Sequence, residues 1–198
     1  MISGRSGQLQ VVTSEERLPP RGQRAGDLPA ADFDAVYRTY FPYVWQTLRR
    51  LGIRPVDLED LAHDVFVVVH RRLDDYDPER AIRPWLFGIA FRLASESRRR
   101  AHRRREIPTP ELDLPTGAPA ADALLEADER RRLVVECLQA LNLEQRAVLI
   151  LVDIDGEAPA DIAASLKLPL PTVYSRLRAG RIKFADAVRR ATLRRGER

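Results

Sequence analysis

The sequence predicts an all-α fold: two small helical domains joined by a Pro-rich linker, the C-terminal one ending in a helix-turn-helix. Three observations lead to this. Apolar residues recur at three- and four-residue intervals in both halves of the chain, and the alternation typical of strands is nearly absent. Residues 106–120 are rich in proline, as extended linkers are, and residues 1–31 have the Gly, Pro, Ser and charged composition of a flexible tail. The predicted domains are therefore 32–105 and 121–192, followed by a short tail at 193–198.

Composition narrows the class of protein. The chain has 198 residues, 44% of them hydrophobic, which is enough for one domain or two small ones. Its net charge is only +4, yet six arginines lie between Arg98 and Arg105, and such clustering suits a polyanionic partner. Cys137 is the single cysteine, which excludes a disulfide framework and a cysteine-based zinc site. Because there is no signal-peptide core and no apolar run near the roughly 20 residues of a membrane span, we expect a cytoplasmic protein without membrane insertion.

The first predicted helix begins after Asp32, a favourable N-cap, and ends at Gly52. Pro42 lies inside its apolar stripe and should kink or split the helix, because proline removes a backbone donor. The stripe consists of Phe33, Val36, Tyr37, Tyr40, Phe41, Val44, Trp45 and Leu48.

Two more helices complete the first domain. Pro55 starts the second, and the third follows Pro84 and runs into the arginine cluster. Trp85 has helical spacing to Ile89, which favours a core position for the tryptophan over a contact role. The apolar faces are Leu58, Leu61, Val65, Val68 and Val69 in the second helix, and Trp85, Leu86, Ile89, Ala90 and Leu93 in the third.

The second domain opens with a helix over about 121–141. Asn142 then caps a new helix, and Gln145 three residues later completes a capping-box pattern. Gly156 ends that helix, and a short helix from Pro159 reaches Leu166.

The last two helices match the spacing of a helix-turn-helix. Ala163 is the small residue where the helices cross, Lys167 is the turn position at which positive φ is favoured, and Val173 anchors the second helix. Val173 begins an inward stripe that continues through Leu177, Gly180, Phe184 and Ala187. The outward face offers donors to a major groove, with flanking cations for phosphates; a three-helix bundle with a basic surface is the alternative. The face comprises Thr172, Tyr174, Ser175, Arg178 and Arg181, flanked by Arg176 and Lys183.

Two stretches resemble a known family. LNLEQRAVLILVDIDGEAPADIAASLKLPLPTVYSRLRAGR (141–181) is similar to the C-terminal promoter-reading domain of bacterial sigma factors. VDLEDLAHDVFVVVHRRLDDYDPERAIRPWLFGIAFRLASESRRR (56–100) resembles their promoter-melting domain. The order and spacing are similar to the extracytoplasmic-function (ECF) group of the sigma-70 family. The resemblance implies a factor that binds core RNA polymerase, reads the −10 and −35 promoter elements and promotes DNA melting, without a cofactor.

An acidic stripe runs along the second helix, where Asp57, Asp60 and Asp64 repeat at i, i+3 and i+7. By itself such a stripe is a solvated helix face. The resemblance implies instead that it docks on the clamp helices of the largest polymerase subunit. Asp60, His63 and Asp64 lack any further ligand pattern, so we expect no metal site. The implied polymerase-binding residues are Asp57, Asp60, Leu61, Asp64 and Val67.

Aromatic and basic side chains alternate from residue 76 to residue 98. Single-stranded bases stack on aromatic faces while cations follow the backbone, so this mixture suits a melted strand. The resemblance implies −10 contacts by Tyr76, Asp77, Arg80, Arg83, Phe91, Arg92, Ser95 and Arg98.

Other function classes are weighed against this one. A stand-alone helix-turn-helix regulator remains the alternative, and it would use the first domain for a ligand pocket or for dimerisation. An enzyme is not expected, because the sequence has no phosphate loop, no nucleophile paired with a base and no metal cluster. The resemblance also implies an anti-sigma factor as a regulatory partner, although no residue here identifies one.

Overall fold

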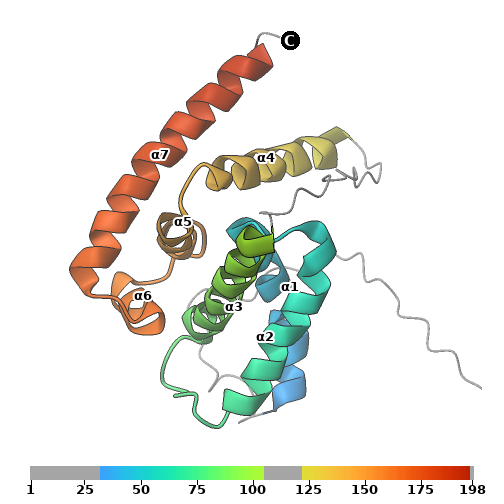
Figure 1. Ribbon diagram of the computed structural model, residues 1–198, viewed down its shortest axis with the longest axis vertical. Coiled ribbons are helices and arrows are strands. Elements are labelled where there is room, and N and C mark those ends of the chain that lie inside the picture. Colours follow the sequence, from blue (N-terminus) through green and yellow to red (C-terminus); the bar gives the residue numbers. More distant parts are fainter. Residues whose placement is uncertain (1–31, 105–121, 197–198) are drawn as a thin grey trace, which may run out of the picture.

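The computed structural model describes residues 32–104 and 122–196, and within these ranges every regular element is helical (Figure 1). This confirms the all-α prediction. The predicted tail at 1–31 and the linker at 106–120 lie outside the described residues. No helix in the described part of the chain has both the length and the apolar character needed to cross a bilayer.

Helix α1, Phe33–Leu51, has the predicted ends. The Asp32 carboxylate accepts a hydrogen bond from the backbone N–H of Asp34 at 3.0 Å, and Gly52 closes the helix at φ +87°. The helix runs through Pro42 in one piece, so the expected split does not occur. Tyr43 and its neighbours on the buried face lose almost all solvent contact, and this burial outweighs one missing backbone donor.

Two further helices pack with α1 to form the N-terminal unit, α1–α3. A 3₁₀ turn at Pro55–Asp57 leads into α2, Leu58–Arg72, and α3 spans Ile82–Arg104. The third helix begins two residues before Pro84, because proline is tolerated in a first turn, where its missing N–H has no partner to lose. All three helices contact one another around a shared apolar core.

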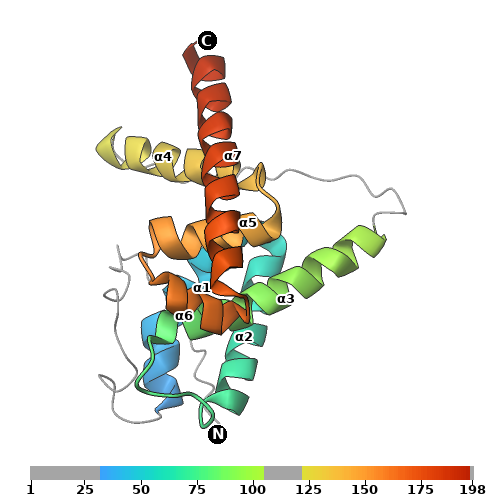
Figure 2. The same ribbon diagram turned by 90° about the vertical axis from the view of Figure 1, so that its left-hand side faces the viewer.

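The C-terminal unit, α4–α7, contains the predicted helix-turn-helix. Its elements are α4, Asp122–Gln139; α5, Leu143–Leu149; a π-helical turn, Ile150–Ile154; α6, Pro159–Leu166; and α7, Leu170–Gly196. Asn142 accepts from the backbone N–H of Gln145 at 2.8 Å, which confirms the predicted cap. α7 is a long rod that packs on α4, α5 and α6 and carries the C-terminal end away from the rest of the molecule (Figures 1 and 2).

The two units lie against each other. α6 packs on α3, while α4 and α5 pack on α1. A single cluster of buried apolar side chains continues from Leu86 of the N-terminal unit to Ile162 and Val173 of the C-terminal unit. The sequence predicted two domains on a linker and gave no indication of this contact.

Candidate functional site

The turn between α6 and α7 has the geometry that the sequence predicts. Lys167 adopts φ 53° and ψ 49°, and it is the one non-glycine residue with positive φ among those described. The backbone N–H of Leu168 bonds to the carbonyl of Ala163 at 2.9 Å and closes α6. On α7, Val173 is fully buried and Leu177 is 7% exposed, as the inward stripe requires.

The opposite face of α7 presents polar side chains. Tyr174 is 54% exposed, Ser175 and Arg178 are exposed, and Thr172 is half-buried. The Ser175 hydroxyl donates to the Thr172 carbonyl at 3.0 Å. Arg178 forms no ion pair with any residue in the described ranges. Its guanidinium is therefore available for a base edge or a phosphate.

Two other arginines of α7 are already paired with carboxylates. Arg176 lies 2.6 Å from Glu144, and Arg181 makes a two-pronged contact with Asp153 at 3.0 and 2.6 Å. The hydrogen bonds that Arg181 donates to Asp153, and then the negative charge of Asp153, raise the pKa of Arg181. A phosphate contact by these arginines therefore shares the guanidinium with the carboxylate or replaces it.

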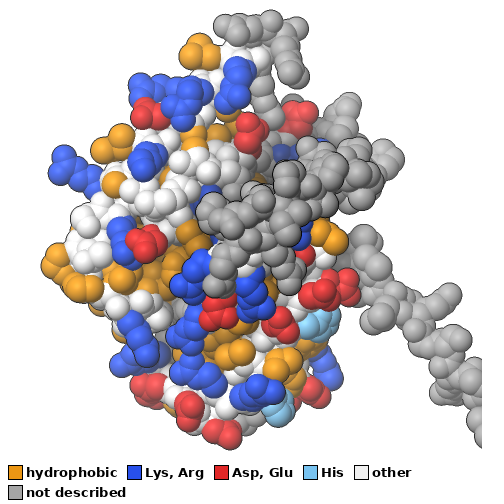
Figure 3. Space-filling view, viewed as in Figure 1, with side chains coloured by type: hydrophobic (Ala, Val, Ile, Leu, Met, Phe, Trp, Pro, Cys, Tyr) orange, Lys and Arg blue, Asp and Glu red, His pale blue; other side chains and the backbone are white. Residues whose placement is uncertain are grey.

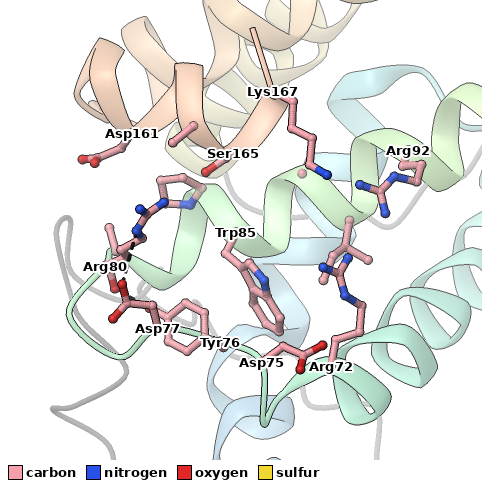
Figure 4. A pocket seen from close by; sticks show the side chains of 15 residues that line it. Arg72, Asp75, Tyr76, Asp77, Arg80, Trp85, Arg92, Asp161, Ser165 and Lys167 are labelled. Carbon is pink, nitrogen blue, oxygen red and sulfur yellow. Dashed lines mark hydrogen bonds and ion pairs between the residues drawn. The ribbon is translucent and has the colours of Figure 1, made fainter.

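The loop after α2, the first half of α3 and the facing residues of α6 enclose a cavity of about 340 Å³ (Figure 4). The Tyr76 and Trp85 rings meet there with centroids 4.8 Å apart, and the Tyr76 hydroxyl donates to the Arg80 carbonyl. Asp77 and Arg80 pair at 3.4 Å, and both are exposed. Trp85 thus lines the cavity as well as packing against the core, whereas its spacing favoured the core position over a contact role. The mixture of rings and cations is of the kind that holds single-stranded bases.

The remaining −10 candidates are spread along α3. Arg92 is exposed and lines the same cavity, and Phe91 is half-buried. The Ser95 hydroxyl donates a hydrogen bond to the Phe91 carbonyl at 2.7 Å. Arg98 donates to the Leu51 carbonyl at 3.3 Å, so part of its hydrogen-bonding capacity serves the end of α1.

Arg83 stands apart from the other −10 candidates, because it is only 3% exposed. Its guanidinium lies 3.3 Å from Asp155 and 3.8 Å from Glu157, and it covers the Tyr43 ring at 4.6 Å. In this arrangement the C-terminal unit covers Arg83, so a DNA contact by this residue requires the units to separate.

A polar cluster that the sequence analysis did not foresee surrounds Asp155. Tyr43 donates its hydroxyl to Asp155 at 2.8 Å, and Arg50 approaches the other carboxylate oxygen at 3.3 Å. Burial, and then the negative charge of Asp155, raises the pKa of Tyr43 well above its usual value, so its hydroxyl keeps the proton it donates. No local pattern marks this cluster, since its members lie about a hundred residues apart in sequence.

Arg146 forms a second junction between the units and was also missed. It is 1% exposed and donates to the Leu51 carbonyl at 2.7 Å, to Gln139 at 2.7 Å and to the Leu141 carbonyl at 3.0 Å. Burial, and then repulsion from Arg98, lowers the pKa of Arg146 to about 10, which leaves it charged at neutral pH. Gly52 makes room for this contact, because a Cβ there would lie 2.6 Å from Arg146.

The acidic face of α2 is open to solvent. Asp60, Asp64 and Val67 are exposed, and Leu61 is half-buried. Asp57 lies in the 3₁₀ turn before α2 and pairs with Arg54 at 2.7 Å. Beside this face an apolar cavity of about 330 Å³ opens between α1 and α2, lined by Phe33, Tyr37, His63, Phe66, Val67, His70 and Arg71.

Charges of both signs are interspersed with apolar patches on the face shown in Figure 3. Among the residues that the structure describes, no three His, Cys, Asp or Glu side chains gather in a way that could hold a metal ion.

Comparison with protein families matches both units in the same order. Residues 36–104 match Sigma-70 region 2, and residues 131–184 match Sigma-70 region 4. The first range runs from the first turn of α1 to the end of α3, and the second runs from the end of α4 through the helix-turn-helix.

Curated relatives and solved structures agree with these matches. The ECF RNA polymerase sigma factor SigK of Mycolicibacterium vanbaalenii is 31% identical over 187 residues, covering 91% of this chain and 92% of that protein. The RNA polymerase sigma factor CnrH of Cupriavidus metallidurans is 30% identical, covering 71% of this chain and 78% of the relative. The structure of CnrH with the cytosolic domain of CnrY superposes with a TM-score of 0.56 at 27% identity, covering 82% of this chain and 90% of the other. The fold also matches the sigma factor RpoE of Bartonella quintana, solved with the anti-sigma factor NepR (TM-score 0.62, 19% identity, 80% and 97% covered).

Proposed function

The chain belongs to the extracytoplasmic-function group of the sigma-70 family, and from this membership we propose how its residues divide the work of transcription initiation. As a sigma factor it binds core RNA polymerase, directs it to promoters and promotes melting; catalysis belongs to the polymerase. The proposal rests on the presence of two sets of features in one chain. One unit contains a helix-turn-helix, and the other has an acidic docking face and a cavity lined by aromatic and basic side chains. A stand-alone regulator would have no use for that second set of features.

The outer face of α7 reads the −35 element. Tyr174, Ser175 and Arg178 are exposed in the N-terminal half of the helix, the half that enters the major groove in helix-turn-helix proteins. Thr172 lies at the start of this face, while Arg176 and Arg181 exchange their carboxylate partners for phosphates. An arginine that is free of ion pairs is best suited to a guanine edge, so we assign base discrimination to Arg178.

The cavity beside Trp85 receives the melted −10 strand. Tyr76 and Trp85 supply ring faces for unstacked bases, and Arg80 and Arg92 supply charge for the backbone. Phe91, Ser95 and Arg98 extend this surface along α3, and Arg83 joins it when the units separate.

The acidic face of α2 docks on the polymerase. Asp60 and Asp64 are exposed carboxylates on one side of the helix, and the exposed Val67 adds apolar area at its end. This combination suits a basic helix with an apolar stripe. We identify that helix with the clamp helices of the largest polymerase subunit.

The protein acts where the chromosome and the polymerase are, and we propose the cytoplasm as that place. We also propose regulation by an anti-sigma factor. Support comes from two similar sigma factors that were solved in complexes, RpoE with the anti-sigma factor NepR and CnrH with the cytosolic domain of CnrY.

Run-off transcription tests the function directly. The purified full chain is mixed with core polymerase and a genomic promoter library, and we expect promoter-specific transcripts that neither component makes alone. Tight duplex binding by the protein alone, without specific transcripts, would instead establish the stand-alone regulator.

Arg178→Ala tests the assignment of the α7 face. Loss of one bidentate base contact should cost about 1–3 kcal/mol of discrimination at one −35 position while polymerase binding stays unchanged. Transcription from promoter variants and a pull-down of core polymerase measure the two effects. Arg190→Ala removes an exposed arginine roughly 18 Å further along the same helix and is the matched control. Reduced polymerase binding by Arg178→Ala would mean that this face is wrongly assigned.

A further inference from the structure

We propose that Asp155 and Glu157 form a latch between the two units, which holds the free protein closed until polymerase separates them. Both residues lie in the loop between the π-helical turn and α6, and they are 1% and 6% exposed. The consequence for promoter binding rests on the proposed function; the closed state itself rests on the contacts alone.

The partners of the latch come from the opposite unit. Asp155 receives the Tyr43 hydroxyl at 2.8 Å and lies 3.3 Å from both Arg50 and Arg83. Glu157 lies 3.8 Å from Arg83. A carboxylate that is fully removed from water needs such partners, so the acids of one unit and the cations of the other depend on each other.

A close backbone approach next to the latch sets how the units fit. A Cβ on Gly88 of α3 would lie 3.0 Å from the Ser165 carbonyl of α6. A side chain at this position meets the backbone of α6, so the two helices would have to move apart by a few tenths of an ångström or more to accept it. Replacement of Gly88 therefore strains the contact between the units while it leaves the acids and cations of the latch intact.

Buried charges suit a closure that must be reversible. Burial of an ion pair carries a desolvation penalty that offsets much of its attraction, so the pair fixes the geometry more than it adds stability. When the units separate, water again solvates the four charged side chains, and this hydration offsets much of the lost attraction between them. The four are Asp155, Glu157, Arg50 and Arg83. Separation of the two units therefore costs less free energy than separation of a purely apolar contact of equal area.

The closed arrangement conflicts with promoter engagement. Asp161, Ser165 and Lys167 of the C-terminal unit line the same cavity as Trp85 and the −10 candidates (Figure 4). Elements centred about 25 base pairs apart are separated by roughly 85 Å of duplex, whereas the two units here are within hydrogen-bonding distance. One closed molecule cannot contact both elements, so closure prevents promoter recognition.

Distance measurements on the full chain test the latch without polymerase or DNA. A donor and an acceptor dye are attached at Glu59→Cys on α2 and Thr192→Cys on α7, both exposed positions, in a Cys137→Ala background. We expect high transfer efficiency for the native latch and a shift to low efficiency when core polymerase is added. In the double variant Asp155→Asn/Glu157→Gln, the closed-to-open ratio should fall at least tenfold, since buried cations lose their charged partners.

Two further variants separate the latch from general destabilisation. Gly88→Gln blocks closure sterically and favours α3 by helix propensity, so it should open the protein without unfolding the N-terminal unit. Asp153→Asn removes one carboxylate charge from the neighbouring π-helical turn, but Asp153 pairs with Arg181 inside the C-terminal unit, so the closed population should persist. Circular dichroism verifies that each variant is folded, and small-angle scattering of the unlabelled chain gives a second measure of opening.

The native protein showing low transfer, or folded latch variants retaining native transfer, would overturn the proposal. These results do not depend on transcription. A protein that closes but starts no transcript contradicts the proposed function alone, and one that transcribes without ever closing contradicts the latch alone.

Discussion

At the scale of single residues, Lys167 carries the least favourable backbone conformation in the described ranges. A left-handed conformation costs a non-glycine residue about 1 kcal/mol or more, yet the turn between α6 and α7 demands it. The chain tolerates this cost because the neighbouring contacts of Ala163 and Val173 fix the two helices around the turn.

Lys167→Gly should therefore stabilise the protein. Relief of the strain exceeds the entropy that glycine adds to the unfolded chain by roughly 0.5 kcal/mol, which raises the thermal midpoint by about 1–2 °C. Differential scanning calorimetry measures the shift. Lys167→Ala removes the same side chain but keeps the strain, so it should not stabilise; equal midpoints for the two variants would contradict the explanation.

Two arginines at the boundary between the units are buried in a way that the sequence does not predict. Arg83 lies among aromatics and other arginines, which favours a nucleic-acid role, and its burial comes from a loop some seventy residues away. Arg146 was overlooked because an arginine in a predicted amphipathic helix is normally exposed. Both are explained by charges and carbonyls in the other unit, which no local pattern reveals.

At the scale of elements, helix ends were predictable because capping is local. Asn142, Gly52 and Pro159 act at the positions expected of them, since each needs only its own neighbours. The exception is Pro42, which sits within a continuous α1. There the burial of the helix in a three-helix core outweighs a local preference.

The cap of α5 can be tested by Asn142→Ala. Loss of the 2.8 Å bond to Gln145 should cost about 1 kcal/mol and lower the thermal midpoint by about 2–4 °C. Asn142→Asp keeps an acceptor and should remain close to native. If urea unfolding finds both variants equally weakened, the side-chain acceptor is not what stabilises the helix start.

The acidic face of α2 makes a prediction of its own. Asp60→Lys places a like charge against a basic partner and should weaken core polymerase binding by about 1 kcal/mol, or roughly fivefold. Fluorescence anisotropy with core polymerase measures the affinity. Asp74→Lys changes the net charge equally from an exposed position just beyond α2 and should have little effect; equal losses would point to net charge and not to this face.

At the scale of the whole molecule, composition and helical periodicity predicted the architecture, and the paired motifs predicted the family. They did not predict that the units pack together. Apolar residues such as Ile162 have the same spacing whether they face their own unit or another, so periodicity cannot assign a contact surface. The exposed side of α7 was predictable because its residues share one helix, whereas the junction around Asp155 joins three separate segments.

Because the two units share one chain, the contact between α3 and α6 is a unimolecular equilibrium. Linked partners meet at an effective concentration on the order of millimolar, so an interface too weak to join two free proteins is enough to keep this one closed. Dilution leaves that balance unchanged. Any protein that binds the covered surfaces competes with the neighbouring unit, whose effective concentration is constant. Only a partner whose affinity is high enough to overcome this intramolecular competition can open the contact, so weak non-specific binding is excluded.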